Sequence, residues 1–221
     1  GSEMNTPKDI EEIVKQWGWD ISKIEIESQP MGATNTSYRC CYCGEQYVVR
    51  LGSSCPELLA INRQAEEAAL KVVSKNNCGA PLVYYDVHTG NMVTRYLAGR
   101  DMNGEDFRNT VLLEGAVRLM RQLHALQTPY TLDMYQDVEQ KLTAIRARGI
   151  PLHPEFSEAY RFYQEIADRY PLETSAFRGL CHGDMFPNNF LLTEEGRIVL
   201  LDYEYTGMSD IFYDFACFSG G

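Results

Sequence analysis

The sequence lacks two features that would define its class at once: long apolar runs and a surplus of basic side chains. Its 221 residues contain no stretch of about 18 apolar residues, and residues 1–30 show no apolar centre of a signal peptide. We therefore expect no membrane span and no export, and hence a cytoplasmic protein. Only 20 Lys and Arg stand against 31 Asp and Glu, a net charge of −11. This deficit argues against nucleic acid as a partner, because such binding needs surplus cations at the phosphates.

An even set of cysteines is also missing. The seven cysteines favour reduced thiols over a disulfide framework. Cys40, Cys41 and Cys43 lie close together, but a zinc site needs a second ligand pair, and none follows. Residues 36–43 and 47–51 are instead typical of two strands joined by a turn. A zinc-binding interaction domain built on the three cysteines remains the alternative.

The remaining composition is that of a folded protein with two parts. Hydrophobic residues make up 44% and charged residues 23%, which excludes a disordered or collagen-like chain. The patterns predict a short helix, two hairpins and one long helix in the first part, at residues 9–17, 36–51, 82–97 and 56–76. In the second part they predict helical stripes at Leu112, Ala116, Leu119, Leu123 and Leu126, and at Phe156, Ala159, Tyr163, Ile166 and Tyr170. We expect an α+β fold with a small antiparallel β lobe, residues 1–98, followed by a mainly helical lobe, residues 99–221.

The long helix predicted over residues 56–76 carries one acidic residue on its inner side. Its apolar stripe is expected at Leu58, Ile61, Ala65, Ala68 and Val72. Glu66 shares a helical column with Leu59 and Val73, whereas Glu67 projects among polar neighbours. Glu66 therefore faces the fold, where a carboxylate needs a cationic partner because burying it unpaired is costly.

The chemistry-bearing residues lie near the C-terminal end of the sequence. Asp184 and Asn189 are five residues apart in a loop tightened by Gly183 and Pro187, and Asp202 follows an apolar strand that returns beside them. Two carboxylates and an amide oxygen suit Mg²⁺, a hard cation that prefers oxygen ligands and leaves positions for substrate phosphates.

These motifs resemble a known family. His182-Gly183-Asp184 with Asn189, followed by Asp202-x-Glu204-Tyr205, is similar to the catalytic loop and metal motif of the choline/ethanolamine kinase and aminoglycoside phosphotransferase group. The continuation to Asp214 looks most like the bacterial choline kinases. The resemblance implies the two-lobed protein-kinase-like fold, with ATP and Mg²⁺ as cofactors. Because members of the group continue past this segment, it also implies a C-terminal lobe that is incomplete here.

The resemblance assigns roles in the catalytic loop. Asp184 becomes the catalytic base, and Asn189 and Asp202 become catalytic Mg²⁺ ligands at the ATP phosphates. Asp214 becomes a structural acceptor for the backbone of the loop, and His182 a brace for it.

It also assigns nucleotide contacts in the first lobe. Arg50 is expected to hold the phosphates and to pair with Glu66, the partner that the helix geometry requires. The remaining nucleotide-binding residues are the covering loop and the hinge beside adenine, with Thr34, Asn35, Thr94, Tyr96 and Leu97.

The expected acceptor is the hydroxyl group of a small-molecule alcohol, with choline first. Ethanolamine, aminoglycosides and thiamine are alternatives, as is a non-catalytic nucleotide-binding module. A quaternary ammonium group suits aromatic faces, for which the neighbouring candidates are Phe186, Tyr203, Tyr205 and Phe212. Core packing is an equally good explanation of each of these rings. Glu204 is left without a role.

Overall fold

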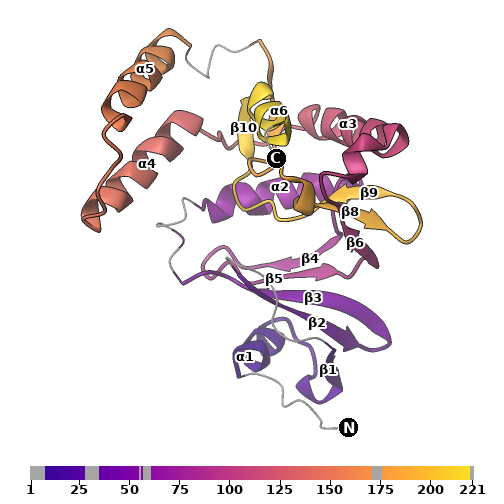
Figure 1. The fold of residues 1–221 in the computed structure, drawn as a ribbon. Coiled ribbons are helices and arrows are strands. Elements are labelled where there is room, and N and C mark those ends of the chain that lie inside the picture. The colour runs from indigo at the N-terminus through magenta and orange to yellow at the C-terminus, as the bar shows by residue number, and fades with distance from the viewer. Residues whose placement is uncertain (1–7, 28–34, 55, 57–60, 171–175, 220–221) are drawn as a thin grey trace.

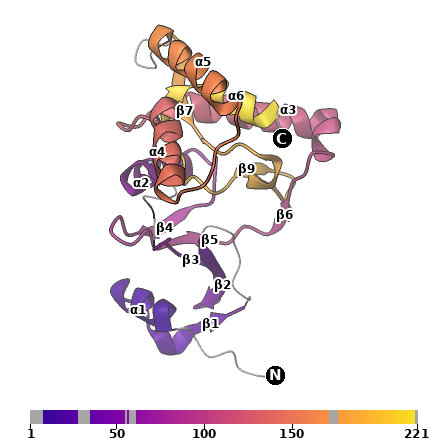
Figure 2. The ribbon, with the colours of Figure 1, turned by 60° about the vertical axis from the view of Figure 1, so that its left-hand side comes forward.

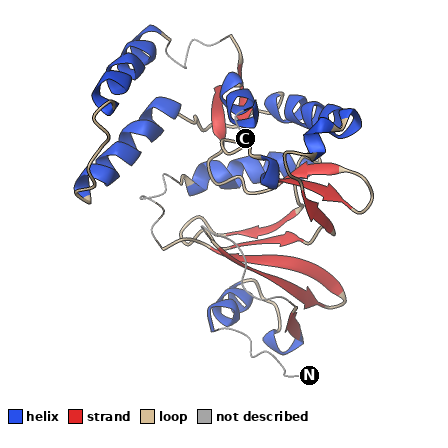
Figure 3. Cartoon of the chain, viewed as in Figure 1, coloured by secondary structure: helices blue, strands red, loops and turns tan. Residues whose placement is uncertain are grey.

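The computed structural model describes residues 8–27, 35–54, 56, 61–170 and 176–219, and shows an α+β fold (Figures 1 and 3). The first hundred residues are rich in strands. Their elements are α1 (Lys8–Gln16), β1 (Ile24–Ile26), β2 (Thr36–Tyr42), β3 (Glu45–Leu51), α2 (Arg63–Lys75), β4 (Leu82–Tyr85), β5 (Met92–Arg95) and β6 (Gly99–Asp101).

The second part is mainly helical, as predicted. Its elements are α3 (Thr110–His124), α4 (Met134–Ala147), α5 (Phe156–Arg169), β7 (Arg178–Cys181), β8 (Phe190–Thr193), β9 (Ile198–Leu200), β10 (Gly207–Asp210) and α6 (Phe212–Ser219). The strand pairs β6-β8-β9 and β7-β10 are short and antiparallel.

Both predicted hairpins are present in one antiparallel sheet with the order β1-β2-β3-β5-β4. Strand alternation gives this sheet two different faces. Tyr47 and Val49 join the cluster beneath the sheet with Ile10 and Val14 of α1. Their neighbours on β3 therefore project to the opposite face, toward the C-terminal part.

Helix α2 begins later than predicted. It starts at Arg63 and not at Pro56, because the side chain of Asn62 accepts the N–H of Ala65 at 3.1 Å and caps the helix there. Its buried face is also displaced from the predicted stripe. The buried residues are Ala65, Glu66, Ala69, Leu70 and Val73, whereas Leu58 lies outside the described residues. Thus Glu66 faces inward, as its column predicted.

Helix α2 packs on the C-terminal part rather than standing apart from it. Ala69, Leu70 and Val73 belong to one core cluster with residues of α3 and with Leu180 and Phe190. In Figures 1 and 2 the helix lies between the sheet and the C-terminal elements. The chain leaves the sheet after β5, and β6 already pairs with β8. The boundary at residue 98 remains a prediction. It is supported by the passage of the chain from β5 in the sheet to β6 beside β8.

Helices α4 and α5 pack against each other and project from the rest of the structure (Figures 1 and 2). The hydroxyl group of Tyr163 donates to the backbone oxygen of Tyr135, and that of Tyr160 donates to Glu139. The stripe predicted on α5 is not core, because none of the residues of α5 is buried. By contrast, Ala116, Leu119 and Leu123 of the α3 stripe are buried.

Helix length and hydropathy also test the prediction about membranes. Within the residues that the structure describes, every helix is too short or too polar to cross a membrane.

Candidate active site

A cleft of about 380 Å³ lies between the sheet and the C-terminal part. The sheet contributes Val48 and Arg50 of β3 and Met92 and Thr94 of β5. These residues alternate with those that face α1, so the period of the strands alone directs them into the cleft. From the other side the cleft is lined by residues of β8, β9 and the following loop, namely Leu191, Leu200, Leu201, Asp202 and Tyr203.

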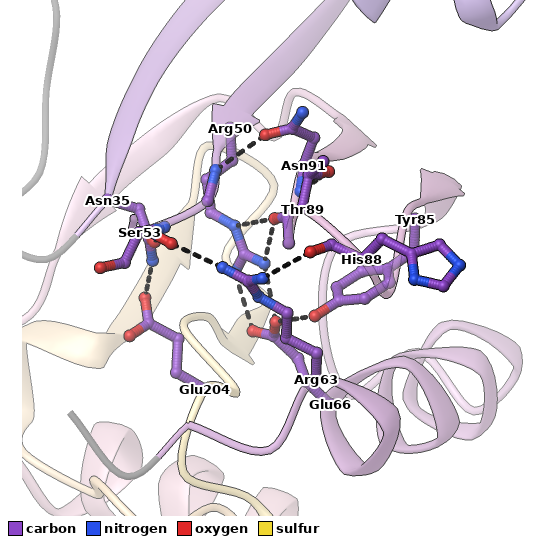
Figure 4. A network of polar contacts seen from close by, with 12 residues as sticks. Asn35, Arg50, Ser53, Arg63, Glu66, Tyr85, His88, Thr89, Asn91 and Glu204 are labelled. Atoms are coloured by element: carbon purple, nitrogen blue, oxygen red, sulfur yellow. Dashed lines mark hydrogen bonds and ion pairs between the residues drawn. The ribbon is translucent and has the colours of Figure 1, made fainter. Parts of the chain in front are cut away.

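A buried ion pair lines the cleft (Figure 4). Nη1 and Nη2 of Arg50 each lie 2.7 Å from one carboxylate oxygen of Glu66. The hydroxyl group of Tyr85 donates to Glu66 at 2.5 Å, and the backbone oxygen of Gly90 accepts from Arg50 at 2.9 Å. Every polar group of the pair has a partner, which offsets the cost of taking two charges out of water. The helix phase predicted an inward Glu66 that needs a cation, and the resemblance named Arg50 as that cation; contact with phosphates remains a prediction for Arg50.

The predicted hinge lies along one wall of the cleft. Thr94, Tyr96 and Leu97 all line it, and Thr94 is buried. The N–H of Tyr96 is engaged, because it donates to the oxygen of Gln46 at 3.1 Å. Among the described residues, none accepts a hydrogen bond from the backbone N–H of Leu97. Its amide is therefore the hinge donor suited to a purine base, and its role in binding adenine remains a prediction.

The loop that carries Asp184 is held from two directions. Asp214 of α6 accepts the backbone N–H of His182 at 2.8 Å and that of Gly183 at 3.0 Å, as predicted. His182 takes the N–H of Asp184 on Nδ1 at 3.2 Å, and its Nε2 lies 2.6 Å from the oxygen of Leu201. These contacts fit a neutral ring with the proton on Nε2. His182 thus joins the loop to the strand end just before Asp202.

Helix α3 adds a further link to this loop. Nε2 of His124 lies 2.8 Å from Oδ2 of Asp214, and both side chains are buried. His124 is therefore a helix histidine whose ring has a buried polar partner. Asp210 precedes α6 and accepts the N–H of Phe212 at 3.0 Å, so it caps that helix.

The three residues expected to hold Mg²⁺ or to act beside it converge on one side of the cleft. Nδ2 of Asn189 donates to the backbone oxygen of Asp184 at 2.6 Å and to its Oδ2 at 3.1 Å. This leaves the amide oxygen of Asn189 for another partner. The backbone oxygen of Asn189 accepts the N–H of Leu201 at 2.9 Å, which places Asp202 beside the loop.

Asp202 has the character of a metal ligand. Its φ angle of +61° lies in the left-handed region, which Asp tolerates better than most residues. The side chain is open to the cleft, yet its carboxylate accepts no hydrogen bond from any of the residues that the structure describes. Partial desolvation by the surrounding protein raises the pKa of Asp202 above its ordinary value, although the residue is exposed at the cleft. An acidic group without a donor, next to an amide oxygen, fits a hard cation.

A second cavity of about 610 Å³ lies beside Asp184. Its wall carries the carboxylates of Asp133, Asp184 and Glu204, and no lysine or arginine belongs to the described residues that line it. Burial raises the pKa of Glu204 to about 7, with Glu66 and Asp202 adding to the effect and Arg50 opposing it.

Two of the four predicted aromatic residues line this cavity. Phe186 and Tyr205 do so, together with Tyr213, which the sequence did not suggest. Tyr203 is core, with 2% of its surface exposed, and its hydroxyl group donates to the oxygen of Cys78. Phe212 packs edge-on against Phe177 and lies outside the cavity wall. For Tyr203 the alternative of core packing is therefore correct, whereas Phe212 is 56% exposed and is neither core nor part of the cavity wall.

The structure also shows contacts that the sequence did not predict. Asn35 donates to Glu204 across the two parts of the chain, whereas Thr34 lies outside the described residues. Asp133 caps α4 by accepting the N–H groups of Tyr135 and Gln136 at 3.0 Å. An Asp just before a helix is a typical capping residue, so the cap could have been predicted from the sequence. The sequence around Asp133 gave no indication that this residue lines the cavity.

The cysteine cluster lies on β2 and the turn after it. Cys40 is buried in the cluster beneath the sheet, and burial raises the pKa of its thiol to about 12. Cys41 follows it on the strand and so projects to the opposite face. Within the described part of the chain, these cysteines form no group of three converging metal ligands.

A sheet carrying a buried cation, a helical part carrying an acidic loop and a cleft between them make up the protein-kinase-like fold of small-molecule phosphotransferases. The chain belongs to the phosphotransferase enzyme family, which matches it over residues 25–219.

The chain is also similar to individual proteins of known sequence or structure. The chain is 24% identical over 173 residues to an uncharacterized protein of Mycoplasma pneumoniae, covering 78% of this chain and 56% of that protein. A choline/ethanolamine kinase family protein from Mesorhizobium loti is 25% identical, with a TM-score of 0.67 over 87% of this chain and 62% of that one. This chain therefore spans less than two thirds of either.

Other solved structures share the fold at lower identity. The choline kinase LicA from Streptococcus pneumoniae is 20% identical, with a TM-score of 0.71 over 95% of this chain and 72% of its own. An aminoglycoside-3'-phosphotransferase of type VIII is 22% identical, with a TM-score of 0.63 over 96% of this chain and 82% of its own. The same fold thus serves acceptors of different chemistry.

Proposed function

We propose that the protein transfers the γ-phosphoryl group of ATP to the hydroxyl group of a small cationic alcohol, with choline as the first candidate. The observation that carries this proposal is the cavity beside Asp184, which is lined by carboxylates and aromatic rings and has no basic residue among its described lining. Such a wall attracts a cation and gives an anionic acceptor no partner.

The cleft beneath the sheet is the proposed nucleotide site. Thr94 and Leu97 would lie beside the base, and Arg50, held by Glu66, would meet the phosphates. Related folds have been solved in complex with AMP for LicA and with ADP for an aminoglycoside phosphotransferase. These complexes support a nucleotide in this cleft.

Asp184 is the proposed catalytic base. Its Oδ2 accepts from Asn189, so the carboxylate is held at the wall of the acceptor cavity. There it would take the proton of the hydroxyl group as the alcohol oxygen bonds to the γ-phosphorus and the bond to ADP breaks. Asn189 and Asp202 would hold Mg²⁺, which when bound neutralises charge on the phosphates.

One observation favours a second acceptor. Helix α4 presents the amide groups of Gln136 and Gln140 to the same cavity. A primary ammonium group has N–H donors for amide oxygens, whereas a quaternary ammonium group has none. Ethanolamine and amino sugars are therefore the competing substrates, with thiamine behind them.

The test is ADP release with MgATP and choline, ethanolamine, thiamine or kanamycin, using Asp184→Asn as the control. Turnover that depends on one alcohol and falls by a factor of about 10²–10⁴ in the control would establish the reaction and the acceptor. The variant should bind MgATP within a few-fold of the unaltered protein in calorimetry. Nucleotide binding without turnover on any alcohol would favour a non-catalytic module, and near-normal turnover of the variant would remove Asp184 as the base.

A further inference from the structure

Asn35, immediately before β2, joins segments that are far apart in the sequence (Figure 4). Its Oδ1 accepts the backbone N–H of Ser53 at 2.9 Å, and its Nδ2 donates to Oε1 of Glu204. Asn35 and Glu204 are 169 positions apart. This one side chain therefore connects the sheet with the wall of the acceptor cavity.

The two bonds fix the direction of the amide. Because Oδ1 takes the N–H of Ser53, the nitrogen must face Glu204, which is only 8% exposed. A carboxylate so far from water needs a donor, and Asn35 supplies one. Aspartate at position 35 would keep the bond to Ser53 but turn a second carboxylate toward Glu204, and alanine would remove both bonds.

Ser53 is itself held from the other side. Nη2 of Arg63 donates to the oxygen of Ser53 at 2.6 Å, and Nη1 donates to that of His88 at 2.8 Å. Arg63 is the first residue of α2, which also carries Glu66. A continuous series of hydrogen bonds thus runs from Glu204 through Asn35 and Ser53 to the helix that holds Arg50.

We propose that Asn35 is a positioning residue that fixes the carboxylate of Glu204 in the wall of the acceptor cavity. It acts through Glu204 and not by touching the nucleotide, which differs from the role that the resemblance assigned to it. This inference rests on the proposed phosphoryl transfer, because the cavity beside Asp184 is taken as the acceptor site.

A matched pair of variants separates positioning from support of the loop. Asn35→Ala should lower kcat about tenfold or more, as expected for losing a hydrogen bond to a charged group, and change the KM for MgATP by less than about threefold. Asn91→Ala is the control, because Oδ1 of Asn91 accepts the N–H of Gly52 at 3.0 Å, one residue before Ser53. It should change kcat by less than about twofold. Equal losses in both variants would overturn the proposal.

A double-mutant cycle tests whether the effect passes through Glu204. In a Glu204→Ala background, Asn35→Ala should cost less than about a further twofold in kcat, because the group it positions is gone. Independent, multiplying losses would contradict the proposal. Exchanging donor and acceptor in Asn35→Asp with Glu204→Gln should restore the contact that Asn35→Asp alone breaks.

Hydrogen exchange of the nucleotide-free protein provides a readout that does not need activity. Asn35→Ala should speed exchange in peptides covering residues 201–206, and Asn91→Ala should not. Unchanged exchange in the Asn35 variant would overturn the contact. If no alcohol is phosphorylated, the proposed function fails, while this measurement still decides on the link between Asn35 and Glu204.

Discussion

The guanidinium group of Arg50 and the carboxylate of Glu66 meet through two parallel hydrogen bonds of 2.7 Å, with side-chain exposures of 6% and 1%. The pair links strand β3 to helix α2 at the wall of the cleft. A paired Arg in this geometry has little freedom to turn, so the guanidinium group of Arg50 is held in one orientation.

Glu66→Gln should destabilise the protein and weaken its use of ATP. Removing one partner of a buried pair typically costs about 3–5 kcal/mol, and a neutral amide that keeps one bond should fall below this range. The matched control is Glu67→Gln, because Glu67 makes only a surface contact of 3.3 Å with Lys71 and such pairs contribute about 0–1 kcal/mol. Thermal unfolding and the KM for MgATP would be measured for both variants. Equal effects would show that the pair does not organise the cleft.

Asp214→Ala should destabilise the loop that carries Asp184. The substitution leaves the N–H groups of His182 and Gly183 and the ring of His124 without their acceptor. Each unsatisfied buried group costs about 1–3 kcal/mol, so the midpoint of urea unfolding should fall clearly. His124→Ala, which removes only one of the three contacts, should have a smaller effect. An order reversed between the two variants would contradict the shared role of Asp214.

Glu204 should make stability depend on pH. Burial raises its folded pKa to about 7, above the ordinary value of 4.5. Between these values the folded state binds more protons than the unfolded state, so this group's contribution to stability falls as pH rises from about 4.5 to 7. Glu204→Gln keeps the shape and removes the titration. The variant should therefore gain melting temperature relative to the unaltered protein between pH 5 and pH 7.5, and a constant difference would contradict the shift.

The cysteines should differ in their reaction with iodoacetamide at pH 8. Cys43 is exposed, whereas Cys40 and Cys181 are buried, and burial raises the pKa of both buried thiols. Mass spectrometry should find Cys43 modified in the native protein and the two buried residues modified only in denaturant. Stoichiometric zinc by elemental analysis, with Cys43 protected, would instead restore the alternative of a zinc domain.

The sequence predicted the orientation of a side chain correctly where the helix or strand period alone determines it. The alternation of β3 directed Arg50 to one face, and the column through Val73 turned Glu66 inward. The cost of burying a lone charge required a cationic partner for Glu66, and the resemblance identified that partner as Arg50. The role of Asp214 came instead from the resemblance, and two backbone hydrogen bonds confirm its contact with the loop.

Contacts between distant segments could not be predicted in the same way. The start of α2 depended on Asn62, a capping residue inside the stretch that was expected to be helical. A helical stripe was predicted on α5, but a helical period does not show whether another element covers that face. Tyr203 and Tyr205 differ by two positions in one motif, and only the packing of Tyr203 against the core separates their roles.

The packing of α2 limits how the chain can be divided into separate fragments. By sequence this helix belongs to the first 98 residues, but Ala69, Leu70 and Val73 are buried in the core of the C-terminal part. A fragment cut at residue 98 would expose this apolar face to water, a liability for aggregation. The two parts should therefore unfold in one cooperative transition, and neither is expected to be an autonomous folding unit.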